Sequence, residues 1–145
     1  MSVTLPRLGT KARFLLIGYG LCLLVWMSLE DNSLIPVIIL GTGLSVISTI
    51  YTLLDNIPHD AVPLPRFLIL VVFTSTAIGG FAPLAIALLM FFKTSWHAHA
   101  FPDYPPALML AMLSRLPAWT LAGFLVGCAL AIFTVLRQSP SYSDL

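Results

Sequence analysis

The side chains best suited to chemistry gather in one stretch, "FFKTSWHAHAFPDYPP", residues 91–106. It holds His97 and His99, with Asp103 nearby, in a chain that is otherwise almost entirely apolar. Imidazole and carboxylate groups are ligands of transition metals, and imidazole also ligates haem iron and chlorophyll magnesium. In an extended loop, side chains two residues apart point to the same side, so both histidines can approach one such group. Chlorophyll or haem is therefore a candidate cofactor of His97 and His99.

The same stretch also fits the aromatic belt of a membrane interface. Tryptophan and tyrosine rings favour the headgroup level of a bilayer, and a lysine near a helix end extends its ammonium outward. A structural zinc site usually shows four ligands at recognisable spacings, and no cysteine lies near these histidines. We therefore favour a belt or a subunit contact over a ligand site, and we predict no metal centre. The expected belt residues are Lys93, Trp96, Phe101, Tyr104, Arg115 and Trp119.

The rest of the chain carries no recognisable catalytic pattern. It has no Ser-x-x-Lys, no His-Glu-x-x-His, no glycine-rich phosphate loop and no paired carboxylates within an apolar segment. Cys22 and Cys128 fall inside apolar runs, where cysteine acts as a small buried hydrophobe. The formal net charge of +1 gives no field that would attract nucleic acid. We expect neither an enzyme nor a nucleic-acid partner.

The composition is that of a membrane protein. Of the 145 residues, 59% are hydrophobic and 9% are charged, whereas a soluble domain has roughly 25% charged residues. A water-soluble fold of this size could not hide so much apolar surface. The mean hydropathy of +0.98 agrees. We predict one all-α, polytopic membrane domain over residues 1–145.

Four apolar stretches are long enough, or nearly so, to cross a bilayer, which takes about 20 helical residues. They must be helices, because lipid leaves backbone polar groups without partners. The predicted transmembrane helices cover residues 12–29, 34–54, 67–92 and 118–136. A short interfacial or re-entrant helix over residues 106–115 is expected between the third and fourth spans, with a bend at Pro117. The tail, residues 138–145, is expected to be disordered.

The third span contains a predicted kink at "GGFAP". Pro83 has no N–H for the carbonyl of Gly79, and it follows Gly79 and Gly80 closely enough to disturb one turn. Such a break can form a substrate or ion site on a discontinuous helix. No ionisable residue accompanies it, so we favour an ordinary packing kink.

Small residues recur every fourth position on two of the predicted spans. Such strips let helix backbones approach closely in lipid, so we predict that both strips are packing faces. The strip of the fourth span consists of Gly123, Gly127 and Ala131, and that of the second span of Gly41, Ser45 and Thr49, followed by Thr52.

The distribution of cations predicts the orientation. With four spans, five lysines and arginines lie on the side of the termini and two lie on the other side. By the positive-inside rule, both termini are cytoplasmic. The inner residues are Arg7, Lys11, Arg13, Arg66 and Arg137, and the outer ones are Lys93 and Arg115.

Two segments of the C-terminal half, "LLMFFKTSWHAHAFPDYPP" and "LPAWTLAGFLVG", resemble small uncharacterised four-span proteins of cyanobacteria and related photosynthetic bacteria. No catalytic motif comes with this resemblance. It implies a setting, which is a bacterial plasma membrane or a thylakoid membrane rich in energy-converting complexes.

Three functions follow as hypotheses. The favoured one is a non-enzymatic accessory or assembly subunit of a larger, possibly photosynthetic membrane complex, with the bilayer and other membrane subunits as partners. The broken third span and the hydroxyl-rich second span favour a small transporter or channel component that acts as an oligomer. The third hypothesis is a pigment- or haem-binding subunit that uses His97 or His99.

Overall fold

A computed structural model describes residues 2–3, 9–57, 62–97 and 102–138. Within these residues, four helical stretches are long and apolar enough to cross a membrane. The fourth of them, Pro106–Arg137, consists of two helices separated by a turn. The elements are α1 (Thr10–Ser28), α2 (Leu34–Asn56), α3 (Leu64–His97), α4 (Pro106–Leu113), α5 (Leu116–Gln138) and a two-residue antiparallel pair of strands, β1 (Ser2–Val3) and β2 (Val62–Pro63).

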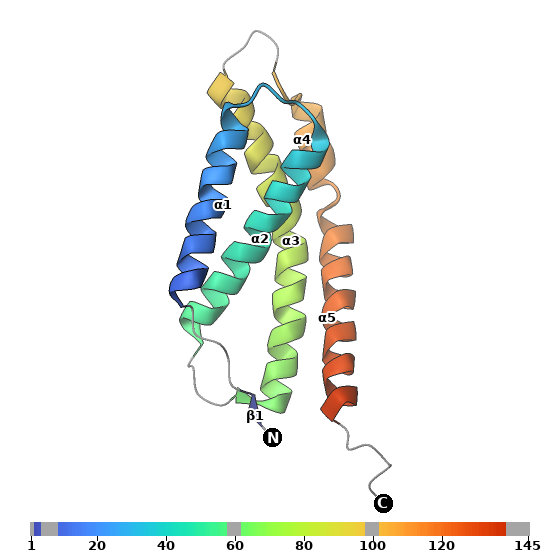
Figure 1. Ribbon diagram of the computed structural model, residues 1–145. Helices are drawn as coiled ribbons and strands as arrows, with labels where there is room; N and C mark the ends of the chain where they lie inside the picture. The colour runs from blue at the N-terminus through green and yellow to red at the C-terminus, as the bar shows by residue number, and fades with distance from the viewer. Residues whose placement is uncertain (1, 4–8, 58–61, 98–101, 139–145) are drawn as a thin grey trace, which may run out of the picture.

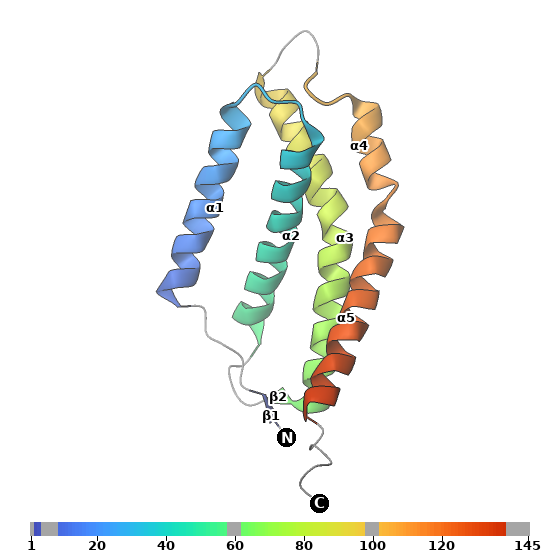
Figure 2. The same cartoon turned by 45° about the vertical axis from the view of Figure 1, so that its right-hand side comes forward.

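Helix α3 is the centre of the arrangement. It contacts α2, α4 and α5, and its lower half runs beside α5 while its upper half leans toward α1 (Figures 1 and 2). Helix α1 begins and α5 ends at the same end of the bundle (Figure 1). The predicted four crossings would likewise place the start of the first span and the end of the last span on one side of a bilayer.

Several helix ends differ by a few residues from those expected, and Gln138, which was predicted to begin a disordered tail, is the last residue of α5, while residues 139–145 lie outside the described residues. Two other differences are larger or change a predicted bend. Helix α3 has 34 residues and continues to His97, whereas residues 67–92 were predicted. It extends because no glycine or proline interrupts the chain after Pro83 and because Lys93 and Thr94 find partners inside the protein. The break between α4 and α5 falls at Ser114 and Arg115, just before the expected bend at Pro117, which lies in the first turn of α5.

The proline of α3 lies at a contact with α2. Pro83 is buried inside the helix and has no N–H for the Gly79 carbonyl. The neighbouring carbonyl of Ile78 accepts a hydrogen bond of 2.8 Å from the Ser45 hydroxyl, which is itself buried. Helix α2 thus supplies a donor where the hydrogen-bond ladder of α3 is weakened.

Helices α3 and α5 touch at their backbones. A Cβ added to Gly79 would lie 3.1 Å from the Cα of Gly123, and one added to Gly123 would meet the Ser75 carbonyl oxygen. A Cβ at Gly127 would lie 2.8 Å from the Cα of Val72. Gly80 faces the same partner helix, because a Cβ there would lie 3.2 Å from the Thr120 hydroxyl. The next residue of the strip, Ala131, is half-buried.

Helix α2 meets α3 in the same way at Gly41, where a Cβ would lie 2.7 Å from the Cα of Ile86. Above this contact lies the apolar core, in the half of the bundle that contains α4. It consists of Trp26, Val37, Ile86, Leu89, Met90, Tyr104 and Met112.

We predict that Gly127→Ile destabilises the protein and leaves its insertion intact. The added side chain meets the backbone of Val72, and overpacking of this kind typically costs about 1–3 kcal/mol. The matched control is Gly20→Ile on α1, where a Cβ finds nothing within 4 Å. Carbonate extraction measures insertion, and thermal unfolding in detergent measures stability. Equal midpoints for the two variants would contradict the packing assigned to Gly127.

Candidate functional site

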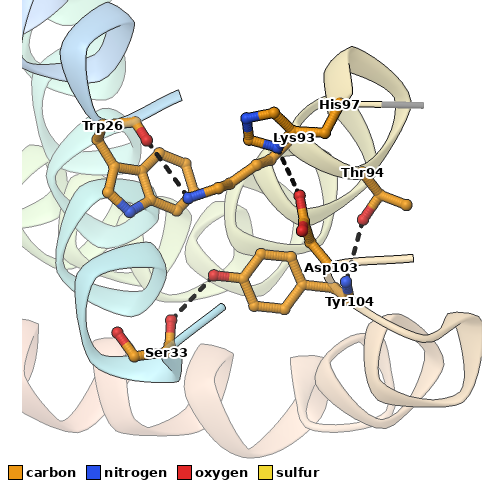
Figure 3. Close-up of polar contacts among 7 residues, drawn as sticks. All are labelled: Trp26, Ser33, Lys93, Thr94, His97, Asp103 and Tyr104. Carbon is orange, nitrogen blue, oxygen red and sulfur yellow. Dashed lines mark hydrogen bonds and ion pairs between the residues drawn. The ribbon is translucent and has the colours of Figure 1, made fainter. Parts of the chain in front are cut away.

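Polar side chains meet at the end of the bundle where α3 ends (Figure 3). They come from α1, from α3 and from the two segments that lead into α2 and α4. We call this group the end cluster. It comprises Trp26, Asp31, Ser33, Lys93, Thr94, His97, Asp103 and Tyr104.

Lys93 is fully buried, with 0% of its surface exposed. Its Nζ donates to the Trp26 carbonyl oxygen at 3.3 Å and lies 4.2 Å from the centre of the Trp26 ring. Among the described residues, no carboxylate lies within ion-pair distance of it. The expectation that Lys93 extends outward is therefore wrong. The indole face and the helix-end carbonyl replace water around the ammonium, which is the environment in which a cation–π contact is strongest.

Tyr104, another expected belt residue, is also fully buried. Its hydroxyl donates to the Ser33 carbonyl oxygen at 2.9 Å, and its backbone N–H donates to the Thr94 hydroxyl at 3.1 Å. Burial, with a smaller contribution from the negative charges of Asp31 and Asp103, raises the pKa of Tyr104 to about 12. The phenol thus stays protonated and can donate, which ties the segment before α4 to the start of α2.

Asp31 shapes the entry to α2. Its carboxylate accepts hydrogen bonds from the Ser33 backbone N–H at 2.9 Å and from the Ser33 hydroxyl at 3.0 Å. These bonds favour the ionised form and lower the pKa of Asp31. The turn holds the Ser33 carbonyl where Tyr104 can reach it.

His97 is the last residue of α3, and its Nδ1 lies 2.6 Å from an Asp103 carboxylate oxygen. The two side chains are 12% and 15% exposed, so the pair is shielded from solvent. His99 and Phe101 lie outside the described residues. Across residues 9–57, 62–97 and 102–138, no group of three or more histidine, cysteine or acidic residues is placed to hold a metal ion.

The remaining belt residues are spread over the molecule. Trp96 is 70% exposed, and Arg115 is exposed at the turn between α4 and α5. Trp119 is half-buried, and its carbonyl faces Gly79. The residues predicted as one belt therefore divide into an internal group and an exposed group.

Four members of the end cluster were not among the candidate site residues predicted from the sequence: Trp26, Asp31, Ser33 and Thr94. Trp26 lies 67 residues from Lys93, so no local pattern joins them. The available signal was a lysine at the end of an apolar run with a tryptophan near the matching end of another span. Consecutive spans run in opposite directions, so the first and third spans run the same way, and their C-terminal ends can lie at the same depth.

The small-residue strip of α2 packs against α3 along one part and borders a groove along another. Gly41 and Ser45 are buried against α3. Thr49 is half-buried, and among the described residues its hydroxyl has no hydrogen-bond partner. It lies at the wall of a groove of about 920 Å³ between α2, α3 and α5. The strip therefore changes from a packing face to a cavity wall along one helix.

Comparisons with protein-family models, with curated proteins and with solved structures found no match to this chain.

We predict that Lys93 and Trp26 are energetically coupled. Trp26→Leu should destabilise by about 3 kcal/mol, because it leaves a buried ammonium without its aromatic face. Lys93→Met keeps an apolar chain of similar length and should change stability by less than about 1 kcal/mol. In the Lys93→Met background, Trp26→Leu should cost about 2 kcal/mol less than in the wild type. Denaturant unfolding of the four proteins measures this, and additivity within about 0.5 kcal/mol would contradict the contact.

Proposed function

We propose that the protein is a non-enzymatic accessory or assembly subunit of a larger membrane complex, and that α1 is the helix that meets a neighbouring subunit. The observation that carries this proposal is the contrast between the glycines of α1 and those of the other helices. The proposal extends to the setting that the sequence resemblance implies, an energy-converting complex of a bacterial plasma or thylakoid membrane.

The glycines of α2, α3 and α5 all lie where another element approaches closely. For Gly41, Gly79 and Gly123 the neighbour is backbone, and for Gly43 it is the Tyr19 ring at 3.1 Å. Glycine in a helix interior is about 1 kcal/mol less favourable than alanine, and in membranes close helix contact offsets this cost.

Two glycines of α1 do not follow this pattern. A Cβ at Gly18 or Gly20 would find nothing within 4 Å. Gly20 borders an apolar crevice of about 530 Å³ between α1 and α3, which is lined by Leu21, Leu24 and Phe92 among others. We infer that a helix from another subunit approaches α1 there.

Helix α1 is attached to the bundle at few points. Trp26 is its buried residue, and the Tyr19 hydroxyl donates to the Leu40 carbonyl oxygen of α2. Leu21 and Leu24 are 57% and 64% exposed. Lipid can cover such a surface, but lipid gives no reason for helix glycines at that position.

The proposed orientation places both termini in the cytoplasm and the end cluster on the outer side, with α4 as an interfacial segment. Lys11, Arg13, Arg66 and Arg137 lie on elements that begin or end at the inner end of the bundle.

An impermeant thiol reagent added outside intact cells should leave a Ser141→Cys variant unlabelled. Ready labelling of that variant would reverse the orientation.

The experiment that tests the function compares Gly20→Ile with Gly127→Ile, the variant that is expected to destabilise the isolated protein. Gly20→Ile should keep the thermal stability of the isolated protein, because its Cβ meets no atom of this chain. It should also remove the protein from the large assembly on native gels of solubilised membranes, because isoleucine blocks the approach of a partner helix. An assembly of unchanged size in the Gly20→Ile variant would overturn the proposal.

A second candidate function, cofactor binding through His97, has one supporting observation. Its Nδ1 pairs with the Asp103 carboxylate at 2.6 Å, and histidines that ligate metals commonly hold a carboxylate in this way. If this function is absent, the His97→Ala, His99→Ala double variant keeps whatever pigment or haem co-purifies with the wild type. Loss of a stoichiometric pigment, measured by absorption spectroscopy, would favour the cofactor function over the first proposal.

A further inference from the structure

We infer that the groove between α2, α3 and α5 is a binding site for one neutral lipid that carries a hydroxyl group. We call it the hydroxyl groove. Its polar side chains include Ser48, Thr49, Thr52, Thr74, Thr76 and Thr120.

The groove exists because α2 and α5 both rest on α3 at different faces. Its volume of about 920 Å³ lies within the roughly 300–1,000 Å³ of small-molecule sites. Phe73 and Phe81 lie along it and are 67% and 54% exposed. They offer an apolar surface for an acyl chain or a ring that enters sideways from the bilayer.

Three hydroxyls in the groove are fixed as acceptors. Ser48, Thr76 and Thr120 each donate to a carbonyl of their own helix, at 3.2 Å, 2.7 Å and 2.8 Å respectively. A hydroxyl that donates its proton still has lone pairs to accept a hydrogen bond. The groove therefore favours a ligand with an O–H donor.

Two further hydroxyls are available as donors. The Oγ1 atoms of Thr49 and Thr74 are buried, and within the described residues neither has a hydrogen-bond partner. An unsatisfied buried hydroxyl is unfavourable, and threonine in a helix populates two χ1 rotamers, so each hydroxyl can turn toward a ligand. The groove therefore also favours a ligand oxygen that accepts.

A hydroxyl group meets both requirements with a single small function, since it donates and accepts. A carbonyl or an ester can only accept. Among the described residues, none that lines the groove is charged, so a phosphate or an ammonium group would enter without a countercharge from them. These constraints select a neutral lipid alcohol, such as a diacylglycerol.

The test uses a dioleoylglycerol with a photoreactive acyl chain, in phosphatidylcholine nanodiscs that hold the full-length protein. The wild type should be labelled on α2 and α3 at the groove. The Thr49→Val, Thr74→Val double variant should be labelled about tenfold less, because two hydrogen bonds are lost while the side-chain shape is kept. The matched control is Thr134→Val on α5, which loses an exposed hydroxyl that donates to the Leu130 carbonyl.

A second variant and a second probe complete the experiment. Ser48→Phe places a large side chain in the groove at an exposed position and should also abolish labelling, with thermal stability measured beside it. The same probe with its hydroxyl methylated should label weakly. Equal labelling by both probes, or labelling that neither variant reduces, would show that bulk lipid fills the groove and would overturn the inference. Gly20→Ile should leave this labelling unchanged, so the result is independent of the proposed subunit contact.

Discussion

Backbone contact between α3 and α5 at Gly79 and Gly123 is the interaction on which the rest of the arrangement depends. In lipid there is no hydrophobic drive between helices, so association relies on close packing and on polar contacts within the protein. This contact fixes α5 on one face of α3, while Gly41 and Ser45 fix α2 on another. The hydroxyl groove is the space left between two helices that are each held by the same third helix.

The contacts of the end cluster have a related cause, because buried polar side chains have no water to bind. Polar side chains at a helix end need partners, and here they obtain them from segments that are distant in the sequence. Lys93 uses the carbonyl and ring of Trp26, and Tyr104 uses the Ser33 carbonyl. These contacts join α1, α2 and the segment before α4 to the end of α3. Between residues 14 and 25, α1 exposes apolar side chains, and it carries two glycines at which a Cβ would find nothing within 4 Å.

The sequence predicts the helical class well, because long apolar runs with few charges have one physical outcome in a bilayer. The four-residue spacing likewise places Gly123 and Gly127 on one face, and the structure puts that face against α3. No local spacing predicts the burial of Lys93, because its partner is a tryptophan 67 residues away. The end of α3 at His97 was missed for a similar reason, because Lys93 and Thr94 find partners in distant segments. The groove depends on how α2 and α5 each pack on α3, and no local spacing in the sequence predicts that arrangement.

The central claim is that α1 faces another subunit, and site-specific photo-crosslinking in native membranes tests it most directly. A photoreactive residue in place of Leu21, which is 57% exposed on α1, is compared with one in place of Ile132, which is 61% exposed on α5. The account predicts a cross-link from position 21 to a second polypeptide and adducts with lipid alone from position 132. Lipid adducts alone at both positions would contradict it.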